Sequence, residues 1–329
     1  MNRLFLIFTI LVLFVLFICT SCEKEESTVS PYIEGLTIDN YPIIDGSTST
    51  LPLNTAITCE LLGLKYQWEE DKSNNKSPTW NMEPRIKGSL KRKFDEVVKS
   101  SQTHNSYINL IDNKADIVLT ARTMSSDEKA YANSKGVTLI EIPIALDAFI
   151  FIVNPLNKLT GLTTEEIQEI YTGKITEWSV HGWEHEYFHE YPKISPFIRN
   201  PNSGSQELMD LLVMKDLDYI DLPMYEENLI ITMLGMADEI ARNPFAIGYT
   251  IYYYNEYIIR AGNRLKTIAV DGIYPNRQTI SDRSYPYTTE VYAVIRSDMD
   301  KSSMAYQIYE WLQTNTGRQA ISKSCYLLN

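Results

Sequence analysis

The chain has 329 residues, with 30 Lys or Arg against 42 Asp or Glu, which gives a formal net charge of −12 at pH 7. This acidic balance argues against nucleic acid as a partner, but it leaves room for an anion held by local N–H and O–H donors. No internal repeat with a period of roughly 20–50 residues is visible, which excludes solenoids and propellers. A chain of this length suggests two domains of ordinary size.

The N-terminus is typical of a secretory signal. One charged residue, Arg3, precedes a short apolar run, as in a signal peptide. A transmembrane anchor is the alternative, but the run is shorter than the ~20 residues that a span needs. The following sequence Cys19-Thr20-Ser21-Cys22 resembles a bacterial lipobox. We therefore predict a lipoprotein signal peptide over residues 1–22 with lipidation at Cys22, the alternative being an ordinary cysteine behind a plain signal.

The residues behind Cys22 are polar and lack apolar periodicity, so residues 23–30 are predicted to form a flexible tether. Its acidic start resembles the surface-export signal of some Gram-negative lipoproteins, which leaves a periplasmic or a cell-surface location open. Cys59 and Cys325 remain for an oxidising compartment, and whether they form a disulfide is left open. No cysteine of the mature chain belongs to a Cys-x-x-Cys pair, so a structural zinc site has no support.

Strands and helices alternate along the rest of the chain. A short strand at 43–44 is predicted to lead through the polar turn 45–50 into a helix that begins at Leu51. Residues 65–93 are polar and are expected to form a long surface excursion. A buried strand is predicted at 116–119.

Two later helix starts carry strong capping signals. Ser125 opens the sequence Ser-Ser-Asp-Glu and Thr163 opens the sequence Thr-Thr-Glu-Glu, and both are predicted capping boxes. Gly173 stands where the second of these helices should end. The apolar runs 137–144 and 149–153 are typical of strands. This alternation predicts an α/β fold with mostly parallel strand pairing.

Three polar turns share hydroxyl side chains and a nearby helix start. A helix N-terminus offers unpaired N–H groups and about half a positive charge, so such turns bind anions without needing a lysine. The first turn, 45–50, contributes Ser47, Thr48 and Ser49 and bends at Gly46. Hydroxyl-rich turns that only cap a helix are common, so a simple cap is the alternative here.

The second turn runs from Arg199 to Ser205 and enters an apolar-periodic stretch. An arginine at a strand end that faces a helix N-terminus supplies bidentate, charge-assisted hydrogen bonds to an anion. Ser203, Gly204 and Ser205 would add hydroxyl and backbone donors. A surface turn with a solvated arginine is the alternative.

The third turn combines the segments 103–106 and 120–122. Ser106 is predicted to be the N-cap of a helix. Arg122 directly follows a buried strand, which is where open α/β sheets place ligand residues. His104 could donate to a ligand, and a hydrogen-bonded, partly buried histidine is the alternative.

Together these segments resemble the phosphate-binding proteins of phosphate ABC importers, which are periplasmic binding proteins with two hinge strands. The resemblance runs from about Ile38 to the C-terminus. Its most specific part is the segment 162–178, with the sequence LTTEEIQEIYTGKITEW. The other matching segments are 45–52, 115–122, Arg199, 203–205, 246–250 and 311–319.

The resemblance implies a receptor with two α/β lobes, each a mostly parallel sheet flanked by helices, which captures phosphate between the lobes and delivers it to a membrane permease. The first lobe is expected to comprise residues 30–146 and 286–329, and the second residues 147–285. The chain would cross between the lobes near Asp147 and near 285–287, and these crossings would be the hinge. Closure around the anion would then be a population shift.

The resemblance also implies a ligand set by position. Arg122 stands where some members of the family have an aspartate that accepts the proton of hydrogen phosphate. A carboxylate rejects a fully deprotonated anion, so an arginine at this position leaves sulfate, molybdate or another oxyanion as alternative ligands, with Asp45 as an alternative proton acceptor. The implied ligand-binding residues are Ser47, Thr48, Ser49, Ser106, Arg122, Arg199, Ser203, Gly204 and Ser205.

Metal and enzyme interpretations have little support. His181, His185 and His189 recur every four residues, a spacing that binds zinc on a helix, but Gly182 and Pro192 flank them and favour a solvated loop. We predict no metal and no cofactor. We also predict no enzymatic activity, because no G-x-S-x-G nucleophile elbow is present and no base–nucleophile constellation is evident.

The expected partners are phosphate or a similar oxyanion, an ABC permease in the membrane, and the lipid bilayer through an acyl anchor at Cys22. The chain is expected to be a monomer on the periplasmic or cell-surface side of a bacterial membrane. A surface-displayed sensing or adhesion module with the same fold is the remaining alternative.

Overall fold

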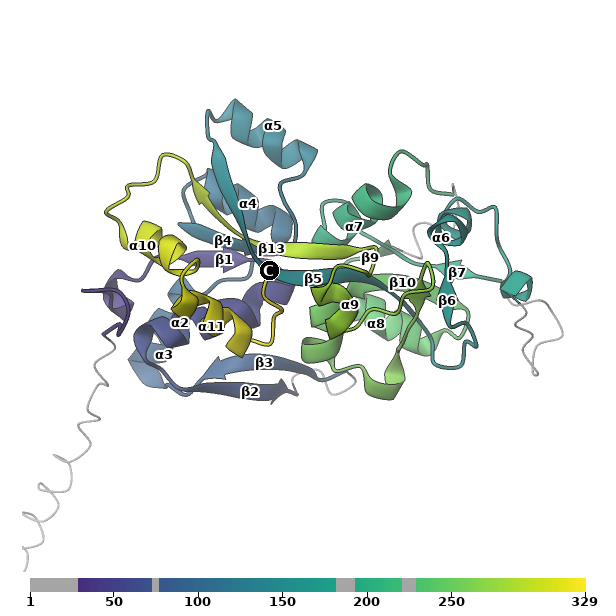
Figure 1. The fold of residues 1–329 in the computed structure, drawn as a ribbon, viewed down its shortest axis with the longest axis horizontal. Coiled ribbons are helices and arrows are strands. Elements are labelled where there is room, and N and C mark those ends of the chain that lie inside the picture. The colour runs from purple at the N-terminus through teal and green to yellow at the C-terminus, as the bar shows by residue number, and fades with distance from the viewer. Residues whose placement is uncertain (1–28, 73–76, 182–192, 221–228) are drawn as a thin grey trace, which may run out of the picture.

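The computed structural model describes residues 29–72, 77–181, 193–220 and 229–329. Within these residues, one sheet of seven strands extends along the molecule, and helices pack around it (Figure 1). The strand order is β1-β4-β13-β5-β10-β7, and β11 also pairs with β5. The bounds are β1 (Ile44–Gly46), β4 (Ile117–Thr120), β5 (Leu139–Val153), β7 (Ser195–Pro196), β10 (Ala246–Ile251), β11 (Lys266–Thr267) and β13 (Thr288–Arg296).

Strand pairing in this sheet is mixed. β1 pairs with β4 and β10 pairs with β7 in parallel, whereas β5 and β13 run antiparallel to their neighbours. β5 is 15 residues long; the part up to Ala148 pairs with β13, and the part from Phe149 onwards pairs with β10. One continuous strand therefore joins the two ends of the sheet. The predicted α/β class is confirmed, and the antiparallel pairs come from the long strands β5 and β13.

Helices gather at both ends of the sheet (Figure 1). Those near β1, β4 and β13 are α2 (Leu51–Leu62), α3 (Gly88–Val97), α4 (Thr103–Ile111), α5 (Ser126–Ser134), α10 (Met304–Trp311) and α11 (Asn315–Lys323). Those near β10 and the far end of β5 are α6 (Thr164–Tyr171), α7 (Gly204–Leu208), α8 (Met233–Arg242) and α9 (Arg277–Ser281). Two short parallel pairs lie beside them, β6 (Gly161–Leu162) with β12 (Ala269–Val270) and β8 (Ile198–Arg199) with β9 (Leu229–Ile230).

Both predicted capping boxes are confirmed. Ser125 precedes α5 and Thr163 precedes α6, and in each case the glutamate three residues later accepts the N–H of the cap residue, at 2.9 and 2.8 Å. Gly173 follows α6 with a left-handed backbone, φ 77°, a conformation that a glycine adopts without strain. The local sequence thus sets where these helices begin and end.

The polar segment 65–93 carries regular structure. β2 (Tyr66–Asp71) and β3 (Thr79–Pro84) form an antiparallel hairpin, and α3 begins shortly behind it. The hairpin packs on α2, and Met82 is buried at that contact. The expected excursion is therefore an ordered hairpin arm, referred to below as the β2–β3 hairpin.

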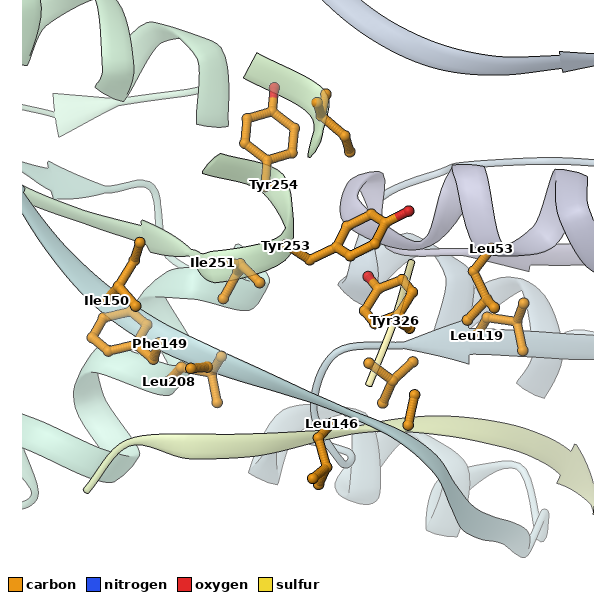
Figure 2. Close-up of a cluster of buried hydrophobic side chains, with 14 of the residues drawn as sticks. Leu53, Leu119, Leu146, Phe149, Ile150, Leu208, Ile251, Tyr253, Tyr254 and Tyr326 are labelled. Carbon is orange, nitrogen blue, oxygen red and sulfur yellow. The ribbon is translucent and has the colours of Figure 1, made fainter. Parts of the chain in front are cut away.

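The apolar core is continuous along β5. Figure 2 shows Tyr253 and Tyr326 between side chains of the two ends, with Leu53 and Leu119 on one side and Ile251 on the other. The two tyrosine rings stack with their centroids 3.7 Å apart and their planes at 4°. Aromatic packing therefore joins the C-terminal segment to the segment behind β10.

Asp147 is a buried carboxyl group in the middle of β5. Its Oδ1 accepts hydrogen bonds from the N–H groups of Ala148 and Tyr253, at 2.8 and 3.0 Å. Its Oδ2 is buried and has no hydrogen-bond partner in the part of the chain that the structure describes. Burial raises the pKa of Asp147 to about 7, because removal from water disfavours the charged form.

Replacing Asp147 with asparagine tests this assignment. An unfolded aspartate titrates near pH ~3.9, so the folded chain retains a proton that the unfolded chain has lost, and the native protein becomes less stable as the pH rises from about 4 to about 7. Asp147→Asn removes this titration. Between about pH 4 and about pH 7 we therefore expect the free energy of unfolding of the native chain to fall by a few kcal/mol relative to that of the variant, at ~1.4 kcal/mol per pKa unit. Urea unfolding of both chains across this range measures the difference, and parallel pH profiles would contradict the assignment.

Candidate functional site

A cavity of about 180 Å³ lies where several helix starts converge. They are the starts of α4, α7 and α8, and of the short 3₁₀ helix η2 (Thr48–Thr50) that runs into α2. The first N–H groups of a helix have no partner within it and carry the positive end of its dipole. The lining is therefore rich in donors; it comprises Ser47, Thr48, Ser49, Gln102, Thr103, Ala121, Arg199, Ser203, Gly204, Ser205, Thr232, Met233, Leu234, Ile251 and Tyr254.

Seven of the nine residues predicted from the sequence line this cavity. Two turns that are far apart in the sequence, one before α2 and one before α7, therefore meet at one place. That these residues bind a ligand stays a prediction. The seven are Ser47, Thr48, Ser49, Arg199, Ser203, Gly204 and Ser205.

The turn before α2 is fixed by Asp45 and Gly46. Asp45 Oδ1 accepts the N–H groups of Gly46 and Ser101, each at 2.8 Å, and Oδ2 accepts Asn109 Nδ2 at 2.8 Å. A Cβ on Gly46 would lie 2.3 Å from the carbonyl oxygen of Leu119, so only glycine fits. Asp45 is thus engaged within the protein and does not belong to the cavity lining, and the alternative that it accepts a ligand proton has no structural support.

Ser106 lies outside the cavity lining, contrary to expectation. Gln102 adopts a left-handed backbone, φ 70°, and α4 begins at Thr103 rather than behind Ser106. Ser106 is consequently inside the first turn of α4, fully buried, and its hydroxyl donates to the carbonyl oxygen of Thr103 at 2.8 Å. The residues that α4 presents to the cavity are Gln102 and Thr103 instead.

Arg122 is likewise placed away from this cavity. Its Nη1 and Nη2 donate to the two carboxylate oxygens of Glu128, each at 2.8 Å, and Nη1 also donates to the carbonyl oxygen of Thr123. Both side chains are buried, with exposed fractions of 4% and 0%. His104 Nδ1 lies 3.1 Å from the same carboxylate, which agrees with the interpretation of His104 as a hydrogen-bonded, partly buried histidine. The charge of Arg122 is therefore balanced within the protein.

Arg199 is buried without such a partner. Nε and Nη2 donate to the carbonyl oxygens of Ile230 and Ile231 at 2.9 and 3.0 Å, and Nη1 lies 3.3 Å from Ser205 Oγ. No carboxylate among the described residues forms an ion pair with it. Burial lowers the pKa of Arg199, although a guanidinium stays protonated in proteins. The cavity therefore contains one buried positive charge that the described residues leave unbalanced.

The backbone around Arg199 is held by a second set of hydrogen bonds. The N–H of Arg199 donates to Gln206 Oε1 at 3.0 Å and to the hydroxyl of Tyr249 at 2.9 Å. The hydroxyl of Tyr249 donates to the same Gln206 oxygen, and Gln206 Nε2 donates to Asp210 at 2.8 Å. This network holds β8 and α7 together, so the guanidinium of Arg199 and the Ser203 turn keep fixed positions relative to each other.

Sequence reasoning missed the contribution of α8. Thr232 caps α8 by accepting the N–H of Gly235 at 2.9 Å, and Met233 and Leu234 line the cavity behind it. Tyr254 adds an aromatic wall from the segment behind β10. The Thr-x-x-Gly cap was a weak signal, because such caps are common and most serve no ligand.

Thr103 and Gly204 meet across the cavity. Thr103 Oγ1 lies 2.8 Å from Ser47 Oγ, which in turn accepts the N–H of Ala121 at 3.3 Å. A Cβ on Gly204 would lie 2.4 Å from the same Thr103 oxygen. The absence of a side chain at Gly204 is therefore what allows the start of α7 to approach the start of α4.

Several predictions fall outside the site or outside the described residues. His181 is 3.7 Å from Glu166, whereas His185 and His189 lie outside the described residues. The signal peptide 1–22, its Cys22 and the tether up to residue 28 also lie outside them. In the described ranges no metal-binding cluster occurs, and no helix there is long and apolar enough to cross a membrane. Cys59 and Cys325 are both free thiols.

A family model described as a PBP superfamily domain matches residues 89–314. The chain belongs to the PBP superfamily. Among curated proteins, this PBP superfamily member is similar to the phosphate-binding protein PstS of Borreliella burgdorferi, with 24% identity over 236 residues that cover 70% of this chain and 79% of the relative.

Solved structures show the same fold. A protein from Clostridium perfringens, solved with bound phosphate, is 20% identical with a TM-score of 0.62 and covers 88% of this chain and 100% of its own. An ABC-type phosphate transport receptor from Vibrio cholerae is 19% identical with a TM-score of 0.58, again over 88% of this chain and 100% of the other. At 19–20% identity, the similarity of these two structures to this chain shows a shared fold.

Gly204→Ala tests the close approach of the two helix starts. We expect the added methyl group to lower the free energy of unfolding by ~1–3 kcal/mol, the usual cost of overpacking. Thr103→Ala in the same chain should recover part of this loss, because the clashing hydroxyl is gone. Urea unfolding of the native chain, both single variants and the double variant gives the coupling energy, and strictly additive effects would argue against the contact.

Proposed function

We propose that this chain is an extracytoplasmic solute-binding protein that captures inorganic phosphate in the cavity and delivers it to an ABC importer. The observation that carries the proposal is the buried guanidinium of Arg199, which has no carboxylate partner among the described residues. A buried charge is costly unless a counter-charge balances it. An oxyanion in the cavity supplies that counter-charge.

The remaining lining suits a small tetrahedral oxyanion. Ser47, Ser49, Ser203 and Ser205 bring hydroxyl groups that donate to anionic oxygens and accept from a protonated one. The helix starts add N–H donors and partial positive charge. The net charge of −12 does not oppose this, because the donors act at hydrogen-bond distance inside a site screened from the outer surface.

The names of the relatives support phosphate and transport. The Borreliella burgdorferi relative is named a phosphate-binding protein, and the Vibrio cholerae structure is named an ABC-type phosphate transport receptor. By analogy, the proposed partners are phosphate and a membrane permease. Nothing in the described site resembles a base–nucleophile pair, so a binding protein is favoured over an enzyme.

Two lobes are proposed to close on the anion. The first comprises residues 30–146 and 286–329, and the second residues 147–285. Ser47 and Thr103 belong to the first, and Arg199 and the Ser203 turn to the second, so an anion in the cavity contacts both. The long strands β5 and β13 are the proposed hinge. Binding then favours the closed state by the difference in affinity between the two states.

Calorimetry on the mature chain tests the ligand. We expect phosphate to bind with measurable heat and in a 1:1 ratio, and sulfate and molybdate to bind more weakly. Binding of sulfate or molybdate without phosphate would assign the chain to another oxyanion. The absence of heat with all three anions would favour a sensing or adhesion module that keeps only the fold.

Arg199→Gln tests the role of the guanidinium. The substitution keeps hydrogen-bonding capacity but removes the charge, and we expect the Kd for phosphate to rise at least ~100-fold, about 2.7 kcal/mol. Arg242→Gln is the matched control, since Arg242 is an exposed arginine on α8 whose ion-pair partner among the described residues is Glu239. Equal affinity of both variants would show that the turn around Arg199 is not the binding element.

The lipid anchor at Cys22 is part of the same proposal, and it places the chain on the periplasmic or cell-surface side of the membrane as a monomer. We expect Cys22→Ser to move the protein from the membrane fraction to the soluble fraction, because a single thiol carries the acyl chains. Fractionation of cells that express each version measures this. Protease treatment of intact cells separates a periplasmic location, in which the chain is shielded, from surface display.

A further inference from the structure

The β2–β3 hairpin reaches from α2 to the segment behind β10. Its base packs on α2, where Met82 is buried and the Tyr66 hydroxyl donates to Glu60 at 2.8 Å. Its far part lies against the segment behind β10, which includes the π-helix η6 (Tyr254–Ile259). The hairpin therefore contacts both halves that the proposed function treats as lobes.

An ion-pair contact forms at the tip side of the hairpin. The Ser77 hydroxyl donates to Asp238 on α8, and Arg264 Nη2 donates to Ser77 Oγ at 2.9 Å and to Asp238 Oδ1 at 2.8 Å. The Asp238 side chain is only 14% exposed. Since α8 also lines the cavity with its first turn, this contact connects the hairpin to a cavity wall.

An aromatic contact forms along the hairpin strands. The guanidinium of Arg260 lies 3.8 Å from the ring centroid of Trp80 on β3 and 5.4 Å from that of Trp68 on β2. The ring of Trp68 also stacks on Tyr257 of η6, at 6.4 Å between centroids. Tryptophan is the aromatic side chain that attracts a cation most strongly, and Arg260 lies within about 6 Å of two of them. The two contacts are chemically independent and both join the same two parts of the chain.

We propose that the β2–β3 hairpin is a strap that holds the two halves together whether or not an anion is bound, and that Arg260 and Asp238 are positioning residues that tighten anion binding from outside the cavity. This inference rests on the proposed function. No residue of the strap lines the cavity, so the strap acts only on the population of the closed state. The apparent Kd equals the intrinsic Kd divided by the closed fraction, and the strap lowers it by raising that fraction.

The test uses the double variant Arg260→Gln with Asp238→Asn in the full mature chain. Asp238→Asn keeps the size of the side chain, Arg260→Gln shortens it to a neutral amide that still donates hydrogen bonds, and each substitution removes a charge. We expect the Kd for phosphate to rise about 10-fold, in proportion to the loss of closed molecules. We also expect the radius of gyration of the ligand-free variant, measured by small-angle X-ray scattering, to exceed that of the native chain. A purely structural role for these residues would lower the melting temperature without enlarging the folded molecule.

Arg242→Gln is the control, because Arg242 is on the same helix α8 as Asp238 and, within the described ranges, forms its ion pair with Glu239 on its own helix. An unchanged Kd in a double variant that is folded overturns the strap, and so does an unchanged radius. Failure of the proposed function looks different: the native chain and the control then bind no phosphate. In that case the comparison of radii still decides whether the hairpin holds the halves together.

Discussion

The binding capacity of the cavity depends on one electrostatic imbalance, the buried positive charge of the Arg199 guanidinium. Its Nε and Nη groups reach two carbonyl oxygens and a hydroxyl, which satisfies hydrogen bonding but leaves the positive charge without a counter-ion among the described residues. The helix starts around the cavity add further positive potential. A fold that concentrates donors and positive charge in one small cavity is preorganised for an anion, because the donors already converge on one place in this structure.

Arg122 shows how such a charge is otherwise accommodated. The two arginines are buried to the same extent, with an exposed fraction of 5% each. Arg122 is locked in a bidentate pair with Glu128, whereas Arg199 is held by neutral oxygens. Glu128 also accepts the N–H of Ser125 in its capping box, so one carboxylate both starts α5 and neutralises Arg122. The charge of Arg122 is thus neutralised within the protein, whereas the charge of Arg199 remains available to a ligand in the cavity.

The sequence predicted those features that depend on neighbouring residues. The capping boxes at Ser125 and Thr163, the α/β class and the turns at 45–50 and 199–205 follow from local patterns. Ser106 was misplaced because Gln102 adopts a left-handed backbone that no residue preference indicates, so α4 begins earlier than its hydroxyl residues suggest. The position of α8 at the cavity depends on tertiary packing, which a single sequence does not encode in any readable local pattern.

The same buried cluster that joins the two ends of the molecule also supports both walls of the cavity. The Tyr326 hydroxyl donates to the carbonyl oxygen of Ser49 in the first wall at 3.0 Å, and its ring stacks on Tyr253 (Figure 2). Tyr253 directly precedes Tyr254, which lines the second wall. The N–H of Tyr253 donates to Asp147 on β5. A movement of one half relative to the other must therefore either slide the ring of Tyr326 along that of Tyr253 or move the two rings together. Because interiors pack densely and do not deform gradually, this arrangement favours discrete states of the cavity over a continuous range of openings.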